Sequence, residues 1–240
     1  MITRVLLAAI IAGMLAGAVA GAVQIWRVSP LILAAEIYET QQDTGLAHTH
    51  GAHDGAAGQA KHDHSGSRAE WAPDDGLERS AYTLVSNLLM GVAFALILGA
   101  AVMLSGRTIT VQNGALWGLA GYLVFTLAPT AGLAPELPGM SAADLTARQT
   151  WWWGTAIATA GGIALMVLQE RVPLKALGVG LITLPHLIGA SRLQTHDSLV
   201  PAALAAEFVA NSLAMMALFW IVLGVALGWT MNRARKDIGS

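Results

Sequence analysis

Five of the seven histidines of this chain lie close together in the sequence. They form two groups, each with an adjacent aspartate: His48, His50 and His53, and then His62 and His64. Imidazole is a ligand for zinc, copper, iron and nickel, and by the same borderline character for cobalt. Because glycine and alanine separate the two groups, the tract predicts a flexible collector of divalent metal ions rather than one rigid site. The alternative is a polar linker whose histidines bind nothing.

Acidic residues precede the histidines. We expect a short helix there, with Ser29 as its cap, Pro30 in its first helical position and its end near Glu39. Glu36, Glu39 and Asp43 have a spacing that places them on one helical face. Three carboxylates on one face could hold a hard or borderline divalent ion, although a solvated polar face is the commoner explanation.

Polar residues also occur inside apolar segments, where they are costly in lipid and usually face the interior of a bundle. Asn87, Glu207 and Asn211 are three of these residues, and the last two are one helical turn apart. The fourth, His186, follows Pro185, which breaks a backbone hydrogen bond and frees a carbonyl group. We predict His186 and Glu207 as metal contacts and the two asparagines as lining of a pathway. For each residue alone, the alternative is an ordinary structural hydrogen bond.

Membrane-spanning helices must position these side chains. The chain is 55% hydrophobic and only 12% charged, whereas soluble domains have about 25% charged residues. Six apolar segments are long enough to cross roughly 30 Å of hydrocarbon, and none alternates as a barrel strand would: residues 5–25, 82–104, 112–128, 152–168, 174–190 and 202–229. The predicted fold is therefore all-α, a polytopic integral membrane helical bundle of about six transmembrane helices with one long external His-rich loop.

The expected organisation has four parts. Residues 1–28 form the first transmembrane helix, residues 29–80 an external acidic and His-rich loop, residues 81–230 a five-helix bundle, and residues 231–240 a basic cytoplasmic tail. Basic residues in the short loops on one side place both termini in the cytoplasm. Gly13, Gly17 and Gly21 recur every four residues and predict close helix packing. A cleavable signal peptide is the alternative for the first segment.

Several function classes are excluded by composition. The net charge of -2 excludes a strongly basic nucleic-acid binder. The absence of cysteine excludes thiolate metal sites and cysteine nucleophiles. The sequence has no phosphate-binding loop motif and no motif for an activated serine. We therefore expect no enzymatic activity and no bound cofactor.

Short motifs along nearly the whole chain resemble those of the CbtA family of predicted cobalt transporter subunits. Besides the histidine tract they are Ala35-Glu36-Ile37-Tyr38-Glu39, Trp71-Ala72-Pro73-Asp74-Asp75-Gly76, Pro135-Glu136-Leu137-Pro138-Gly139, Arg148-Gln149-Thr150-Trp151-Trp152 and Leu184-Pro185-His186-Leu187-Ile188-Gly189-Ala190. The resemblance implies a multi-pass protein of the bacterial inner membrane that takes up cobalt for cobalamin synthesis. It also implies a small single-span partner, CbtB, and about five spans. Carried over, Glu36, Glu39, His186 and the histidine tract are the metal-handling positions.

Two hypotheses follow for a chain embedded in the lipid bilayer. In the first, the acidic His-rich loop collects Co²⁺ outside and the bundle passes it inward; residues alone reach only a divalent cation, so nickel or zinc transport stays open. In the second, the protein is a non-transporting metal sensor or scaffold. The sequence is also compatible with a homo-oligomer.

Overall fold

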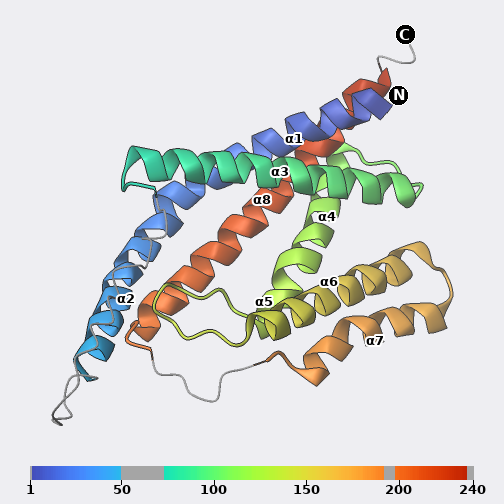
Figure 1. The fold of residues 1–240 in the computed structure, drawn as a ribbon. Helices are drawn as coiled ribbons and strands as arrows, with labels where there is room; N and C mark the ends of the chain where they lie inside the picture. The colour runs from blue at the N-terminus through green and yellow to red at the C-terminus, as the bar shows by residue number, and fades with distance from the viewer. Residues whose placement is uncertain (1, 50–72, 192–197, 237–240) are drawn as a thin grey trace, which may run out of the picture.

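The computed structural model describes residues 2–49, 73–191 and 198–236, and all its regular elements are helical (Figure 1). The elements are α1 (Ile2–Val23), η1 (Gln24–Val28), α2 (Ser29–Thr49), α3 (Leu77–Leu104), α4 (Val111–Tyr122), η2 (Leu123–Leu127), α5 (Ala128–Gly132), α6 (Leu145–Leu168), α7 (Val172–Ile188) and α8 (Ala202–Lys236). The all-α prediction is confirmed.

The first helix does not end where the sequence suggested. α1, η1 and α2 form one continuous helix, and η1 is a π-helical turn in which the Ser29 N–H donates to the Gln24 carbonyl. The prediction that Ser29 caps a new helix is therefore wrong, because Ser29 itself has helical backbone angles. A proline ring collides with the carbonyl four residues earlier, and a widened turn just before Pro30 relieves that collision.

The same device occurs a second time. In η2 the Ala128 N–H donates to the Leu123 carbonyl, and Pro129 follows directly. The helix of α4, η2 and α5 therefore continues to Gly132 rather than ending near Ala128. Other helices also extend past their apolar parts, since α6 begins at Leu145 behind an Asp144 cap whose carboxylate accepts from the Ala147 N–H at 2.9 Å.

Close glycine contacts join the helices in three antiparallel pairs. In the pair α1 and α3, Gly13 and Gly17 lie directly against the backbone of Gly91 and Asn87. This contact confirms the packing expected from the glycine stripe of α1. The other two pairs use the same kind of contact: Gly114 and Gly118 of α4 with Gly224 and Trp220 of α8, and Gly162 of α6 with Gly178 of α7.

The core surrounds Trp220 of α8. Its ring stacks on Phe125 with centroids 5.6 Å apart and lies 4.9 Å from Phe94. Its Nε1–H donates to Thr126 Oγ1 at 3.3 Å, so the one polar atom of this buried indole has a partner. The hydroxyl comes from the η2 turn, which thus fixes α4 and α5 against α8.

Five of the described helices are long and apolar enough to cross a membrane, and α7 is a shorter apolar helix of 17 residues. α8 runs antiparallel to α1, since Thr230 near the end of α8 donates to the Ala8 carbonyl near the start of α1. The two ends of the described chain therefore lie together at one end of the bundle (Figure 1).

Candidate functional site

A polar cavity of about 770 Å³ lies between η1, α2 and the first turns of α3. It is lined by Gln24, Glu36, Pro73, Asp74, Asp75, Arg79, Tyr82, Thr83, Ser86, Asn87 and Met90. This lining contains three carboxylates, those of Glu36, Asp74 and Asp75, and one guanidinium group, that of Arg79, so the cavity has an acidic excess. Fields of this sign attract cations.

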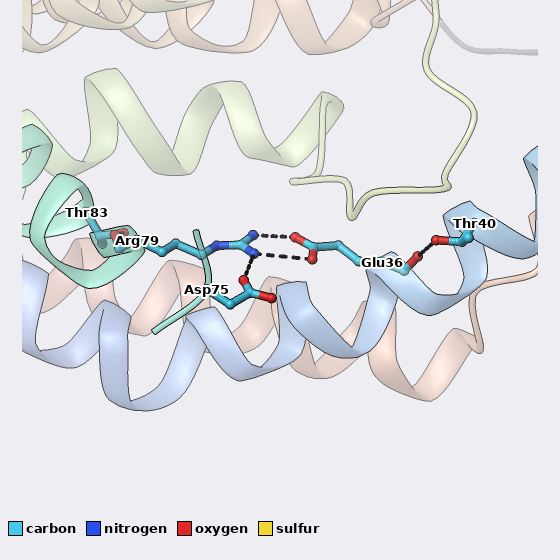
Figure 2. Close-up of polar contacts among 5 residues, drawn as sticks. All are labelled: Glu36, Thr40, Asp75, Arg79 and Thr83. Carbon is cyan, nitrogen blue, oxygen red and sulfur yellow. Dashed lines mark hydrogen bonds and ion pairs between the residues drawn. The ribbon is translucent and has the colours of Figure 1, made fainter. Parts of the chain in front are cut away.

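Arg79 of α3 joins the two helices that line the cavity, because it pairs with Glu36 of α2. Its guanidinium group donates to both carboxylate oxygens of Glu36, and its Nη1 also reaches Asp75 Oδ1 at 3.0 Å (Figure 2). Asp75 is one helical turn before Arg79, whereas Glu36 comes from the opposite helix, α2. The side chains of Arg79 and Glu36 are 30% and 36% exposed, so this fork is partly shielded from water.

Local backbone geometry places this fork. Gly76 precedes α3 with φ of +100°, a conformation that favours glycine and turns the chain from Asp75 into the helix. The Arg79 N–H then donates to the Asp74 carbonyl at 3.1 Å, which fixes the first turn. On the other side, the widened turn of η1 sets the rotation of α2 and so the direction in which Glu36 projects.

Deeper in the cavity, Asn87 lies against the π-helical turn. Its Nδ2 donates to Gln24 Oε1 at 2.7 Å and to the Thr83 carbonyl at 2.8 Å. Asn87 is 9% exposed, and the close contact of Gly17 with its backbone brings the two helices near enough for the bond to Gln24. The structure thus brings the predicted residues Glu36 and Asn87 into one cavity, and it gives Asn87 the interhelical contact that was its alternative.

The remaining residues of the predicted collecting segment have different surroundings. Glu39 is exposed on α2, where its backbone meets Gly139 of the segment between α5 and α6. His48 belongs to the last turns of α2, and its side chain lies outside the described part. The other four histidines of the tract lie outside the described residues: His50, His53, His62 and His64.

His186 and Glu207 have different helical neighbours. His186 is exposed in the last turn of α7, with its ring 6.0 Å from and steeply inclined to the ring of Trp151. Glu207 is exposed near the start of α8, and its carbonyl accepts from Asn211 Nδ2 at 2.8 Å. α7 packs along α6, whereas α8 packs along α1 and α4 (Figure 1). The roles of His186 and Glu207 as metal contacts therefore stay predictions.

Sequence reasoning missed Arg79 and Gln24. Gln24 is a polar residue within the first apolar segment, and it could have been found by the criterion that singled out Asn87. The spacing of four between Asp75 and Arg79 is a signal that could have found their ion pair, whereas the bond from Arg79 to Glu36 depends on how α2 and α3 pack. Within residues 2–49, 73–191 and 198–236, no group of three His, Asp or Glu side chains could hold a metal ion by itself.

Comparison with known families covers almost the entire chain. The family described as probable cobalt transporter subunit (CbtA) matches residues 2–232. No curated protein and no solved structure matches the chain. Because the match includes the cavity, both π-helical turns and all six apolar segments, the chain belongs to the CbtA family of probable cobalt transporter subunits.

Proposed function

We propose that this protein is the membrane subunit through which Co²⁺ is taken up across the bacterial inner membrane, and that the cavity at Glu36 receives the ion. The observation that carries the proposal is the acidic lining of this cavity in a chain of the cobalt transporter family. Co²⁺ accepts carboxylate and imidazole ligands, and both kinds of group occur in this part of the chain.

The position of the histidine tract in the chain supports this route. The tract ends with His64, and the chain re-enters the described structure at Pro73, which itself lines the cavity. The tract is therefore flanked in the sequence by Glu36 on one side and Asp75 on the other. An ion that leaves the imidazoles can pass to these carboxylates. Collection by a flexible tract raises the local concentration of the ion without requiring a rigid site.

Arg79 provides the positively charged group in the cavity lining, and an incoming divalent ion competes with this group for Glu36. The pair is partly exposed, so breaking it costs much less than separating a fully buried pair. We propose that Co²⁺ replaces the guanidinium group at Glu36 while Asp75 keeps Arg79 in place. Asn87 and Gln24 line the same cavity and can supply neutral amide oxygens.

His186 and Glu207 are proposed as further metal contacts. Exposed ionisable groups on membrane helices usually pair with another protein surface or a water-filled path. A small single-span subunit such as CbtB, or a second copy of this chain, would provide such a surface.

The proposal is tested by uptake of radioactive cobalt into cells that make this chain together with its partner subunit, with cells lacking this chain as the control. We expect counts inside the cell only when the chain is present, with nickel and zinc as competitors to identify the preferred ion. Binding of cobalt to the protein without any uptake would contradict transport and would support the sensor or scaffold.

A further inference from the structure

An apolar groove lies on the surface of the bundle where α8 packs along both α1 and α4. Its volume is about 540 Å³, and each of its eight lining residues is apolar: two from α1, one from α4 and five from α8. Leu15, Ile221 and Trp229 of this lining are between 42% and 48% exposed, so the groove is open toward its surroundings. Along α8 it extends from Ile221 to Trp229, which is about 12 Å at the rise of an α-helix.

Arg233 lies at one end of the groove. Its Cζ is 4.2 Å from the centroid of the Trp229 ring, and the residue is exposed. The spacing along α8 places it on the same helical face as three residues of the lining: Val222, Ala226 and Trp229. The guanidinium group therefore follows the apolar face in the last turn of this span, which is the level where tryptophan and arginine meet lipid headgroups.

Basic residues gather in the sequence around this end of the groove. α1 runs antiparallel to α8, so Arg4 near the start of α1 belongs to the same end of the bundle. Arg235 and Lys236 follow Arg233 in α8, and Asp237 is the first acidic residue after them. α1 and α4 contain no acidic residue. Basic residues therefore outnumber acidic ones at this end, which attracts anionic groups.

The side chains around the groove indicate a flexible occupant. A transmembrane helix that packs closely on another helix needs small residues at the contact. Glycines of these helices serve contacts inside the bundle instead, for example Gly17 with α3, and Gly114 with Gly224. The sides of the groove carry larger leucine, valine, isoleucine and tryptophan side chains. An acyl chain can follow such an uneven apolar surface, whereas the rigid cylinder of a helix cannot approach it closely.

We propose that this groove binds an anionic phospholipid of the bilayer, with one acyl chain along α8 and the phosphate group at Arg233. The apolar lining contacts the acyl chain, and the planar guanidinium group can donate two parallel hydrogen bonds to phosphate oxygens. Stacking on Trp229 orients that group at the end of the groove before the lipid binds. Basic sites between membrane helices recognise anionic headgroups in this way.

The inference goes beyond the proposed function and does not depend on which ion the protein carries, since the groove shares no residue with the cavity at Glu36. A lipid in the groove contacts α1, α4 and α8 at once, so it stabilises the packing of these three helices. A zwitterionic lipid carries an ammonium group beside its phosphate, and the basic residues at this end of the groove disfavour that group. The site therefore selects lipids by net charge.

Thermal unfolding of the purified full-length protein in detergent tests this selection, with phosphatidylglycerol or phosphatidylcholine of the same acyl chains added. Phosphatidylglycerol should raise the Tm of the wild-type protein by about 5 °C, and phosphatidylcholine should raise it much less. Arg233→Gln should need about tenfold more phosphatidylglycerol for half of the shift. Arg171→Gln is the matched control and should respond like the wild type, because it removes an exposed arginine from the turn between α6 and α7, which does not line the groove. Equal shifts with the two lipids, or a wild-type response of Arg233→Gln, would overturn the proposal.

Occupancy in the native membrane can also be measured, because the chain has no cysteine and a single one can carry a photoactivatable group. At Ile221→Cys this group should form an adduct with the mass of one phospholipid. Anionic lipids should be enriched in that adduct relative to the adduct at Ile157→Cys, a position on α6 that is 67% exposed and does not line the groove. The same lipid composition at both positions would contradict the proposal. A protein adduct at Ile221→Cys would also contradict it, since the occupant would then be a second copy of this chain or another protein.

Discussion

Gly17 of α1 is the position where a single added carbon should do most harm to the cavity. A Cβ atom built there lies 2.4 Å from the Asn87 carbonyl oxygen and 2.8 Å from the Leu88 Cα, whereas ordinary contacts begin at 3.4 Å. Because both atoms belong to backbone, neither can rotate away. Gly17→Ala therefore forces α1 and α3 apart by about 1 Å.

The cost follows from this displacement. The bond from Asn87 to Gln24 is 2.7 Å long and would lengthen to about 3.7 Å, beyond the range of a hydrogen bond. Overpacking of a tight contact costs about 1–3 kcal/mol, and an interhelical hydrogen bond in a membrane protein contributes about 0.6 kcal/mol. The higher helix propensity of alanine offsets at most about 1 kcal/mol of this loss. The net loss is about 1–3 kcal/mol, or a fall in Tm of roughly 3–10 °C.

Thermal unfolding in detergent provides the assay, and alanine substitutions at two other glycines provide the comparison. At Gly99 of α3 a Cβ atom meets nothing within 4 Å, so Gly99→Ala should leave the Tm unchanged or raise it slightly. At Gly21 the nearest atom is the flexible tip of Leu84 at 3.0 Å, so Gly21→Ala should have an intermediate effect. If Gly17→Ala were as stable as Gly99→Ala, the close contact of α1 and α3 would be refuted.

Three further predictions concern the ion pair of Glu36 and Arg79, the histidine tract and the Asp144 cap of α6. A double-mutant cycle of Glu36→Gln and Arg79→Gln should give a coupling of about 1–2 kcal/mol, since the pair is bidentate and partly shielded; a value near zero would show that the fork does not form. Replacing the tract histidines with glutamine should lower cobalt uptake at low external metal and spare the maximal rate; loss of the maximal rate in an inserted protein would place them on the conduction route. The five are His48, His50, His53, His62 and His64. Asp144→Ala should lower the unfolding free energy by about 1 kcal/mol through loss of the α6 cap, measured against Glu170→Ala at an exposed position after α6.

Hydropathy predicted the helices because a span needs only a long apolar segment. It could not predict the continuous helix from α1 to α2, since Ser29 followed by Pro30 is the usual pattern of a helix start. The π-helical turn that accommodates this proline depends on backbone geometry rather than on side-chain type.

The candidate site was predicted in part. Glu36 and Asn87 were found because a carboxylate beside a metal-binding tract and an amide in an apolar segment both stand out in the sequence. Their meeting in one cavity was not predicted, because it depends on Gly17 and on the bond with Gln24. His186 and Glu207 stand out in the sequence as polar residues in apolar segments, but the sequence does not show which helices pack together: α7 packs on α6, and α8 packs on α1 and α4.

Cobalt uptake by a Glu36→Gln variant tests the central claim most directly. The change removes one charge from the cavity and keeps the size of the side chain, and Glu78→Gln, an exposed glutamate beside Arg79 that does not line the cavity, is the matched control. With protein amounts equalised in the membrane, the initial rate for Glu36→Gln should fall by about tenfold or more, as for loss of a metal-site group, while Glu78→Gln keeps the wild-type rate. A wild-type rate in Glu36→Gln would contradict the assignment of this cavity as the place where the ion enters.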